Sequence, residues 1–355
     1  MKEELLKLLE QLVSLKGVSG FEQEVVKAIV SMMGPFADEI EVDNFGNIYA
    51  VKRGRCEGPR LMVVAHSDEV GAIINEVLPN GMLRFRPIGV VSNLTLPATM
   101  VKVGNITGVI GSRPAHLEDS KTDGRIDLHI DIGASSAEEV RSMGIDIGTP
   151  ASFIGDLVPL GNPDRVCGHA LDNRIGCALI IQLFKELASN DFVGTLYGVI
   201  TVQEETTMTG ARIAAGRVLP DCAIAVDTVP ANDTSNACIP KFTIGGGPVI
   251  QLAEGVQGAY VGTIAHPSVK RAILQAAQSE NIKVQLAAEI GNWTTDATAI
   301  HTAGKGIPTG FISVPRRYAH SQAEVLDIND AVLAVRLLER IVKDLEHLKI
   351  SFFEN

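Results

Sequence analysis

The sequence contains few of the residues that build cysteine-based sites or aromatic surfaces. Aromatic residues make up only 5% of the chain, and no Cys-x-x-Cys pair occurs among its five cysteines: Cys56, Cys167, Cys177, Cys222 and Cys238. An odd number of cysteines without such a pair argues against both a disulfide framework and a zinc site made of thiolates. A Gly-x-Ser-x-Gly motif is also absent, so the sequence gives no support to a serine hydrolase.

The chain also lacks an excess of positive charge and a long apolar run. Its net charge of −11 argues against binding to nucleic acid or to an anionic membrane, since both require a basic surface. Charged residues or glycines interrupt each apolar run well before the ~18 residues of a transmembrane helix. Residues 1–6 are acidic and amphipathic, unlike a secretion signal. We therefore expect a cytoplasmic protein with no nucleic-acid or membrane partner.

Apolar spacing indicates alternating helices and strands on both sides of a different, central segment. A length of 355 residues exceeds the usual limit of one hydrophobic core, so two domains are expected. Residues 61–65 are apolar without interruption, which is typical of a strand buried on both faces. Ser19 and Glu22 have the spacing of a capping box that begins a helix. The remaining predictions are helices over 3–15, 174–188 and 328–348, and strands over 40–42, 48–51, 197–202 and 222–226.

The central segment differs in its sequence pattern from the rest of the chain. From about residue 71 to residue 159, short β-like pieces alternate with Gly, Pro and Asn, with one short helix at 136–143. The sequence therefore predicts an α/β fold with a mixed central sheet flanked by helices on both faces. It also predicts an inserted small β-barrel-like domain. Residues 1–70 and 160–355 would form one discontinuous domain, and residues 71–159 would form the insertion.

Carboxylates and histidines stand where the predicted apolar strands end. In open α/β sheets, sites form beyond the carboxyl ends of the strands. The candidates that follow strands or begin a helix are His66, Asp68, Asp172, Glu204, Glu205, Asp227 and His320. Taken singly, each has a simpler explanation: an Asp can cap a helix or start a turn, a lone His is more often structural, and adjacent glutamates are usually solvated. Their combination, without a cysteine, favours a site for Zn²⁺, Co²⁺ or Mn²⁺.

Two details of this pattern suggest a division of roles. Successive residues that leave a strand point in different directions, so one carboxylate of Glu204-Glu205 can bind metal while its neighbour faces the substrate water. A hydrolytic two-metal site needs such a general base. Asp68, two residues after His66, could accept the other ring N–H of His66 and fix its tautomer.

Five ordered blocks resemble the signature of the M42 family, the dinuclear metallo-aminopeptidases that include glutamyl aminopeptidase and the tetrahedral TET peptidases. The blocks are Ala65-His66-Ser67-Asp68-Glu69-Val70-Gly71, Ala170-Leu171-Asp172-Asn173-Arg174, Val202-Gln203-Glu204-Glu205, Ala225-Val226-Asp227 and Tyr318-Ala319-His320-Ser321. The similarity extends from the first predicted helix to the last. It implies a zinc-peptidase type of fold and an aminopeptidase that removes N-terminal residues from short peptides.

The resemblance also implies a site for two divalent ions, Zn²⁺ or Co²⁺, in each subunit. Its five ligands would be divided between the ions: His66 and Asp227 for one, Glu205 and His320 for the other, and Asp172 for both. Glu204 would be the general base. The inserted domain would help to build dimers, so we expect a homo-oligomer between a dimer and a dodecamer.

The sequence departs from the family pattern beside the site and leaves other functions open. Thr206-Thr207-Met208-Thr209 stands where members often have Val-Gly, and Asn292-Trp293-Thr294 interrupts a Gly-rich block before Asp296. Trp293 would either pack in a core or an interface, or form a pocket wall. The same metal site would also serve an N-acyl amino acid deacylase. A non-catalytic relative would be expected to have lost Glu204 or Asp172, and both are present.

Overall fold

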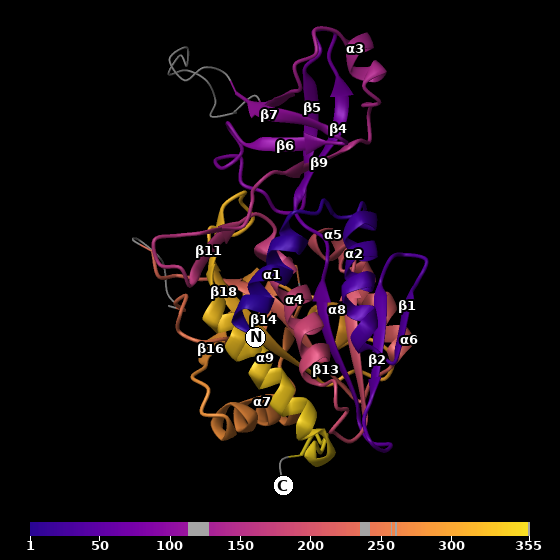
Figure 1. Ribbon diagram of the computed structural model, residues 1–355, viewed down its shortest axis with the longest axis vertical. Coiled ribbons are helices and arrows are strands. Elements are labelled where there is room, and N and C mark those ends of the chain that lie inside the picture. The colour runs from indigo at the N-terminus through magenta and orange to yellow at the C-terminus, as the bar shows by residue number, and fades with distance from the viewer. Residues whose placement is uncertain (113–127, 235–241, 257, 260, 354–355) are drawn as a thin grey trace.

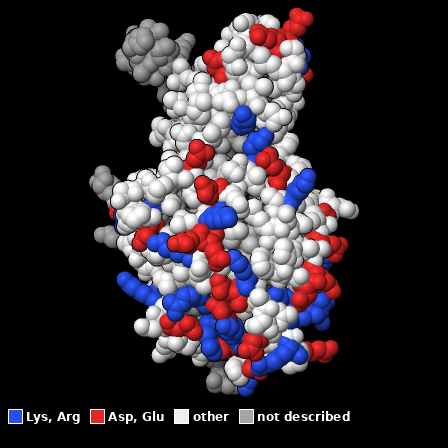
Figure 2. Space-filling view, viewed as in Figure 1, with Lys and Arg blue, Asp and Glu red and all other residues white. Residues whose placement is uncertain are grey.

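The fold was obtained as a computed structural model that describes residues 1–112, 128–234, 242–256, 258–259 and 261–353; Cys238 lies outside these ranges. A large mixed sheet carries helices on both faces, and a closed barrel projects from one end of it (Figure 1). This confirms the predicted fold class. Acidic and basic side chains are interspersed over the main domain, whereas the visible barrel surface carries fewer of them (Figure 2).

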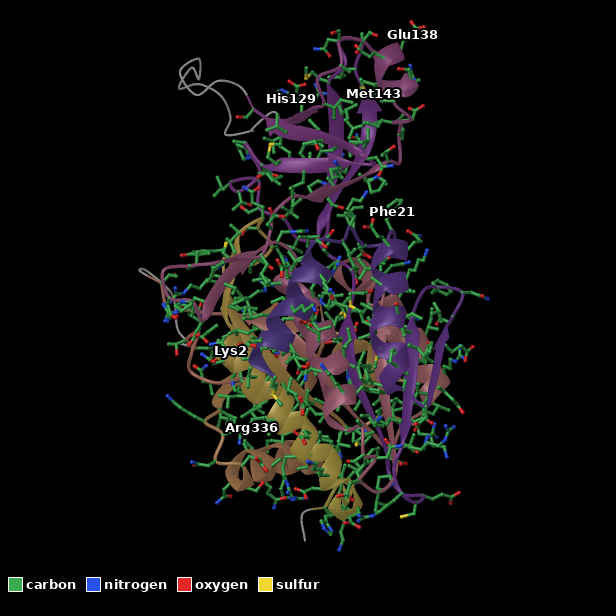
Figure 3. All side chains as sticks on the ribbon, viewed as in Figure 1. Lys2, Phe21, His129, Glu138, Met143 and Arg336 are labelled. Atoms are coloured by element: carbon green, nitrogen blue, oxygen red, sulfur yellow. The ribbon has the colours of Figure 1, made fainter. Side chains whose placement is uncertain are left out.

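The barrel is formed by six strands that close in the order β4-β5-β8-β7-β6-β9. Alternate residues fill its interior, as Val101 and Val103 do in β6, because successive side chains in a strand point to opposite faces. The short helix α3 (Ala137–Ser142) is capped by Ser136, whose hydroxyl accepts the Glu139 N–H. Glu138 and Met143 lie at the end of the barrel remote from the main sheet (Figure 3). The strands are β4 (Gly71–Val77), β5 (Leu83–Ile88), β6 (Met100–Val103), β7 (Ile106–Gly111), β8 (His129–Asp131) and β9 (Pro150–Phe153).

The main sheet has four adjacent parallel strands, β12, β3, β13 and β18, at its centre. Antiparallel strands extend it on both sides, and β14 pairs with β18 and carries three short strands of its own. In sheet order the strands are β1 (Glu39–Val42), β2 (Ile48–Arg53), β12 (Thr195–Thr201), β3 (Arg60–His66), β13 (Cys222–Pro230), β18 (Thr309–Arg317), β19 (Glu324–Asp327), β11 (Arg165–Gly168) and β10 (Val158–Pro159). The strands around β14 (Val249–Val256) are β15 (Val261–Ile264), β16 (Gln285–Ala288) and β17 (Asn292–Trp293).

Two hydrophobic cores cover the two faces of this sheet. Leu61 and Val63 of β3 face one core, and Met62 and Val64 face the other. The continuous apolar run therefore forms a strand buried on both faces, as predicted. The first core is covered by α1 (Lys2–Val13), α2 (Gln23–Met33), α4 (Leu171–Glu186), α7 (Pro267–Ser279) and α9 (Ile328–Lys343), and the second by α6 (Thr209–Val218) and α8 (Ala297–Ile300). Within the described residues, no helix is long and apolar enough to cross a membrane.

The predicted capping box at Ser19 and Glu22 is wrong. Helix α2 begins only at Gln23, and no side-chain cap bonds to it. The Glu22 carboxylate instead accepts the backbone N–H groups of Gly20 at 2.7 Å and Gln203 at 3.0 Å. The Glu22 carboxylate is therefore bonded to Gly20 and, across the fold, to the segment before Glu204, whereas the Ser19 N–H that a capping box would offer it donates to the Glu69 carbonyl oxygen.

Candidate metal centre

The predicted site residues come together at the carboxyl ends of the parallel strands. His66 is the last residue of β3 and stands opposite Thr201 at the end of β12. Asp227 lies within β13, which continues to Pro230 instead of ending at residue 226 as predicted, and Asp172 lies in the first turn of α4. Because neighbouring parallel strands end at the same edge of the sheet, side chains in or after their carboxyl-terminal halves converge there. His320 reaches the same place from the connection between β18 and β19.

A tight turn after β12 directs the two adjacent glutamates into the site. Gln203 has a left-handed backbone with φ of 58°, and the short helix α5 (Glu204–Thr207) begins directly after it. The Asp68 carboxylate accepts two backbone N–H groups of that first turn, from Glu204 at 2.9 Å and Glu205 at 3.0 Å. An anionic acceptor is favourable at the N-terminal turn of a helix, where the backbone N–H groups lack partners.

Asp68 thus has a different contact from the one expected of it. Its carboxylate Oδ1 lies 3.6 Å from His66 Nδ1, beyond a normal hydrogen bond, whereas its backbone carbonyl lies 3.2 Å from that nitrogen. The ring of His66 is therefore oriented by the main chain of Asp68. The carboxylate of Asp68 orients Glu204 and Glu205 instead.

Two groups of potential ligands share Asp172. In the first group, His66 Nε2 lies 3.3 Å from Asp172 Oδ1 and 3.6 Å from Asp227 Oδ1. In the second, His320 Nε2 lies 3.2 Å from Asp172 Oδ2 and 3.5 Å from Glu205 Oε1. Ligand atoms that each lie about 2 Å from one Zn²⁺ are about 3–3.5 Å apart, so both groups have spacing suited to a cation. A third combination, His66 with Glu204 and Glu205, also lies within 4.8 Å.

The hydrogen bonding of these residues also fits divalent cations. Asp172 Oδ1 and Glu205 Oε1 are buried, and neither accepts a hydrogen bond among the described residues. Leaving buried carboxylate oxygens without hydrogen-bond donors is unfavourable unless another positive group compensates them. The potential metal ligands are carboxylate oxygens and imidazole nitrogens, with no thiolate among them. This set of ligands suits Zn²⁺, Co²⁺ or Mn²⁺.

Burial and crowding of carboxylates shift the ionisation of the whole cluster. Burial and the neighbouring Asp172 raise the pKa of Asp227 to about 6, and burial raises the pKa of Glu205 to about 8. Burial alone would lower the pKa of His320, but its hydrogen bond with Asp172 and the charge of Glu205 raise it to about 9. Burial, opposed in part by the charge of His66, raises the pKa of Glu204 well above its ordinary value. The raised pKa of His320 means that a cation must compete with a proton for this ligand.

The orientation of His320 depends on the inserted segment. Its Nδ1 lies 2.7 Å from the carbonyl oxygen of Val90, which follows strand β5 of the barrel. This contact turns Nε2 toward Asp172 and Glu205. A small cavity beside the site is lined by Asp172 and His320 together with Phe153 of the barrel strand β9. The site therefore lies where the barrel joins the main domain.

Arg316 and Glu324 are two buried charged residues at this site that the sequence reasoning missed. Both contact Asp172. Arg316 closes the apolar run of β18, and Glu324 opens β19, so each stands at a strand end as the recognised candidates do. Position at a strand end was thus a signal that could have found them.

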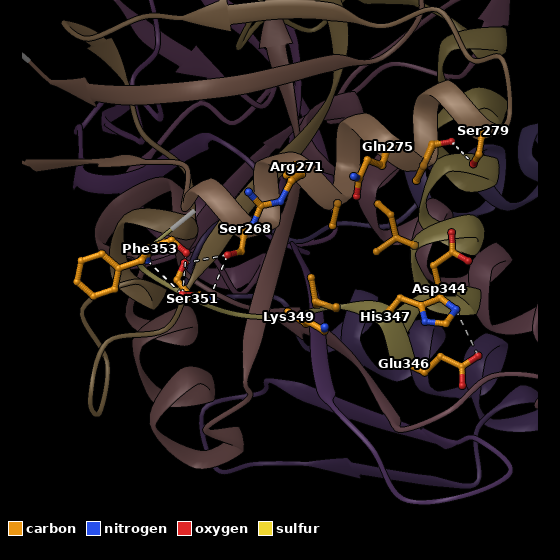
Figure 4. A pocket seen from close by; sticks show the side chains of 14 residues that line it. Ser268, Arg271, Gln275, Ser279, Asp344, Glu346, His347, Lys349, Ser351 and Phe353 are labelled. Carbon is orange, nitrogen blue, oxygen red and sulfur yellow. Dashed lines mark hydrogen bonds and ion pairs between the residues drawn. The ribbon is translucent and has the colours of Figure 1, made fainter. Parts of the chain in front are cut away.

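A much larger pocket lies elsewhere and shares no residue with the cluster. It has a volume of about 800 Å³ and lies between α7 and the C-terminal segment (Figure 4). Arg271 and Gln275 line it from the helix, and His347, Lys349 and Phe353 line it from the chain end. Pocket volume therefore does not point to the candidate metal centre in this chain.

Comparison with known proteins identifies the class to which this fold and site belong. The profile described as M42 glutamyl aminopeptidase matches residues 46–337. The chain is thus a hydrolase of the peptidase class. More narrowly, it belongs to the M42 peptidase family, which confirms the resemblance inferred from the five sequence blocks.

Several relatives match over almost their whole length. A putative aminopeptidase of Acetivibrio thermocellus is 39% identical over 95% of this chain and 98% of its own. The structure of an aminopeptidase from the archaeon Desulfurococcus kamchatkensis has a TM-score of 0.91 at 32% identity and covers 99% of both chains. The TET1 peptidase of Pyrococcus horikoshii, described as assembling into a tetrahedron or a large octahedral shell, has a TM-score of 0.83 at 30% identity, over 95% of this chain and 99% of its own.

Proposed function

We propose that this protein is a dinuclear metal-dependent aminopeptidase that removes N-terminal residues from short peptides. The observation that carries the proposal is the position of Asp172 between the two histidines. Its Oδ1 lies 3.3 Å from His66 Nε2, and its Oδ2 lies 3.2 Å from His320 Nε2. A carboxylate with one oxygen in each group of ligands has the arrangement required to bridge two cations. His66 and Asp227 would complete one site, and Glu205 and His320 the other.

When bound, two divalent ions such as Zn²⁺ or Co²⁺ lower the pKa of a water molecule and polarise the scissile carbonyl. Glu204 acts as the general base in this proposal. Its Oε2 lies 3.8 Å from His66 Nε2, and its side chain is only 10% exposed. The Glu204 carboxylate accepts a proton from the attacking water and delivers it to the amine that leaves as the peptide bond breaks. The Asp68 carboxylate holds Glu204 in place by accepting the backbone N–H of Glu204.

We further propose that the protein forms a homo-oligomer between a dimer and a dodecamer. In this proposal residues 1–70 and 160–355 form the catalytic domain, and residues 71–159 contribute contacts between copies. Support comes from the family membership and from the described shells of the related TET1 peptidase. Light scattering after size-exclusion chromatography of the full chain, and of a variant altered on the barrel surface, tests this assembly.

A substrate panel tests the proposed activity. Aminoacyl p-nitroanilides and short peptides, each with a free or an N-acetylated amine, are assayed after metal removal and again after Zn²⁺ or Co²⁺ is added. We expect hydrolysis of the free-amine substrates only after metal addition, and no hydrolysis of the acetylated ones. Release of acetate from N-acetyl amino acids instead would identify a deacylase. Full peptidase activity in the metal-stripped protein would contradict the proposal.

A further inference from the structure

Glu324 connects two segments of the candidate site that lie far apart in the sequence. Its side chain is buried, at 1% exposure, at the start of β19. Oε2 accepts the backbone N–H of Asp172 at 3.0 Å, and Oε1 accepts the backbone N–H of His320 at 2.8 Å. One carboxylate therefore fixes the main chain of both residues that would share an ion.

The backbone of His320 makes this contact especially consequential. Its φ of 56° lies in the left-handed region that residues with a side chain adopt rarely, although His does so more often than most. A backbone in this conformation persists when surrounding contacts determine it. The hydrogen bond to Glu324 is a contact of this kind, made directly at the N–H of His320.

Arg316 joins Glu324 to the side chain of Asp172. Its guanidinium Nη1 lies 3.1 Å from Glu324 Oε1, and Nη2 bonds to Asp172 Oδ2. Its Nε donates to the hydroxyl of Thr228 at 2.6 Å, and Thr228 directly follows Asp227. A planar guanidinium fixes several acceptors in one geometry, which an ammonium group on a flexible chain does not do. Arg316 is itself only 3% exposed.

We propose that Arg316 and Glu324 are positioning residues of the metal centre. Together they hold the carboxylate of Asp172 and the backbone of His320 at the separation needed for both to bind the same ion. This inference rests on the proposed function. It adds that affinity for the ion shared by Glu205 and His320 depends on the Arg316–Glu324 pair, although neither residue would be a ligand.

The neighbouring residue on β18 offers a matched control. Arg317 donates from Nε and Nη2 to the two carboxylate oxygens of Asp233, each at 2.7 Å. The side chains of this pair are 20% and 11% exposed, and no hydrogen bond or ion pair among the described residues joins them to a proposed ligand. Arg317→Lys therefore removes a forked arginine–carboxylate interaction from the same strand without touching the centre.

Titration of metal-stripped protein with Co²⁺ tests the inference, with calorimetry and the visible absorption of bound Co²⁺ as readouts. For Glu324→Gln and Arg316→Lys we expect one of two sites to weaken by about 10- to 100-fold, the range found when partners of metal ligands are altered. Turnover should fall with little change in KM at saturating Co²⁺. For Arg317→Lys, both the Co²⁺ affinity and the turnover should stay within about twofold of the original protein, because this residue is not a partner of a metal ligand.

The outcomes separate this inference from the proposed function. If the unaltered protein binds no Co²⁺, the proposed function fails first. If it binds two ions, and Glu324→Gln and Arg316→Lys bind both as tightly as Arg317→Lys does, the positioning role is overturned. Circular dichroism establishes that each variant is folded. If Glu324→Gln does not fold, Arg316→Lys decides the question, because it keeps the positive charge beside Asp172 and loses only the planar geometry.

Discussion

The two adjacent glutamates provide a sharp test of the proposed chemistry, because each is the control for the other. Glu204→Gln keeps the shape of the side chain and removes a group that can accept a proton. Loss of general-base catalysis costs a factor of about 10² to 10⁴ in rate. This corresponds to about 2.7–5.4 kcal/mol in the activation barrier. The backbone N–H that binds Asp68 is unchanged by the substitution, so α5 should keep its position.

Glu205→Gln should lose an ion, whereas Glu204→Gln should keep both. Glu205 Oε1 lies 3.5 Å from His320 Nε2 and accepts no hydrogen bond among the described residues, as expected of an atom that binds a cation. Replacing it removes an anionic ligand, so one ion should be lost. The assay combines the hydrolysis rate of leucine p-nitroanilide with metal content by mass spectrometry after desalting. A Glu204→Gln variant with full activity, or one that has lost its ions while Glu205→Gln retains both, would contradict the roles assigned to the two glutamates.

Three further predictions concern the site and the buried charges around it. Asp172→Ala should lose both ions and all activity, and metal analysis that finds two tightly bound ions would contradict the bridging role. Glu69→Gln leaves the buried guanidinium of Arg174, 3.4 Å away, without a counter-charge. It should destabilise the protein by about 3–5 kcal/mol in urea unfolding, whereas Glu39→Gln, in an exposed pair, should cost about 0–1 kcal/mol. Burial lowers the pKa of His169, but the Glu69 carboxylate outweighs it and raises that pKa above 6.5. This interaction therefore contributes fully to the free energy of unfolding below about pH 6.5, and the contribution is lost as pH rises through the pKa of His169 in the folded protein. His169→Gln should remove this pH dependence from the free energy of unfolding.

The sequence indicated much of the fold because its apolar patterns follow the burial of the strands. The run at residues 61–65 became a strand between two cores, and the change of texture after residue 71 coincides with the start of the barrel strand β4. Helix ends were less accurate. Glu22 has the spacing of a local cap, but it binds the backbone of Gln203, a residue 181 positions away. The spacing of residues along the chain does not show that a distant backbone N–H, such as that of Gln203, will bond to the Glu22 carboxylate.

In the candidate site, too, the residues could be predicted from the sequence, but some of their contacts could not. Residues at strand ends were found because parallel strands bring their ends together, whatever the loops between them. Contacts made through the main chain were not predictable in this way. Asp68 bonds to the backbone of two glutamates, and the His66 ring bonds to a carbonyl oxygen. Trp293 contacts an apolar cluster and donates its indole N–H to Gln251 at 2.8 Å, which identifies packing as one of its roles.

The most direct test of the dinuclear centre is a crystal structure of the protein loaded with Zn²⁺, with anomalous diffraction recorded at the zinc edge. A dinuclear centre should give two peaks about 3.5–4 Å apart, the separation usual for paired hydrolytic ions. One peak should lie beside His66 and Asp227, the other beside Glu205 and His320, with the Asp172 carboxylate between them. A single peak, or two peaks that do not share Asp172, would contradict the proposed dinuclear centre.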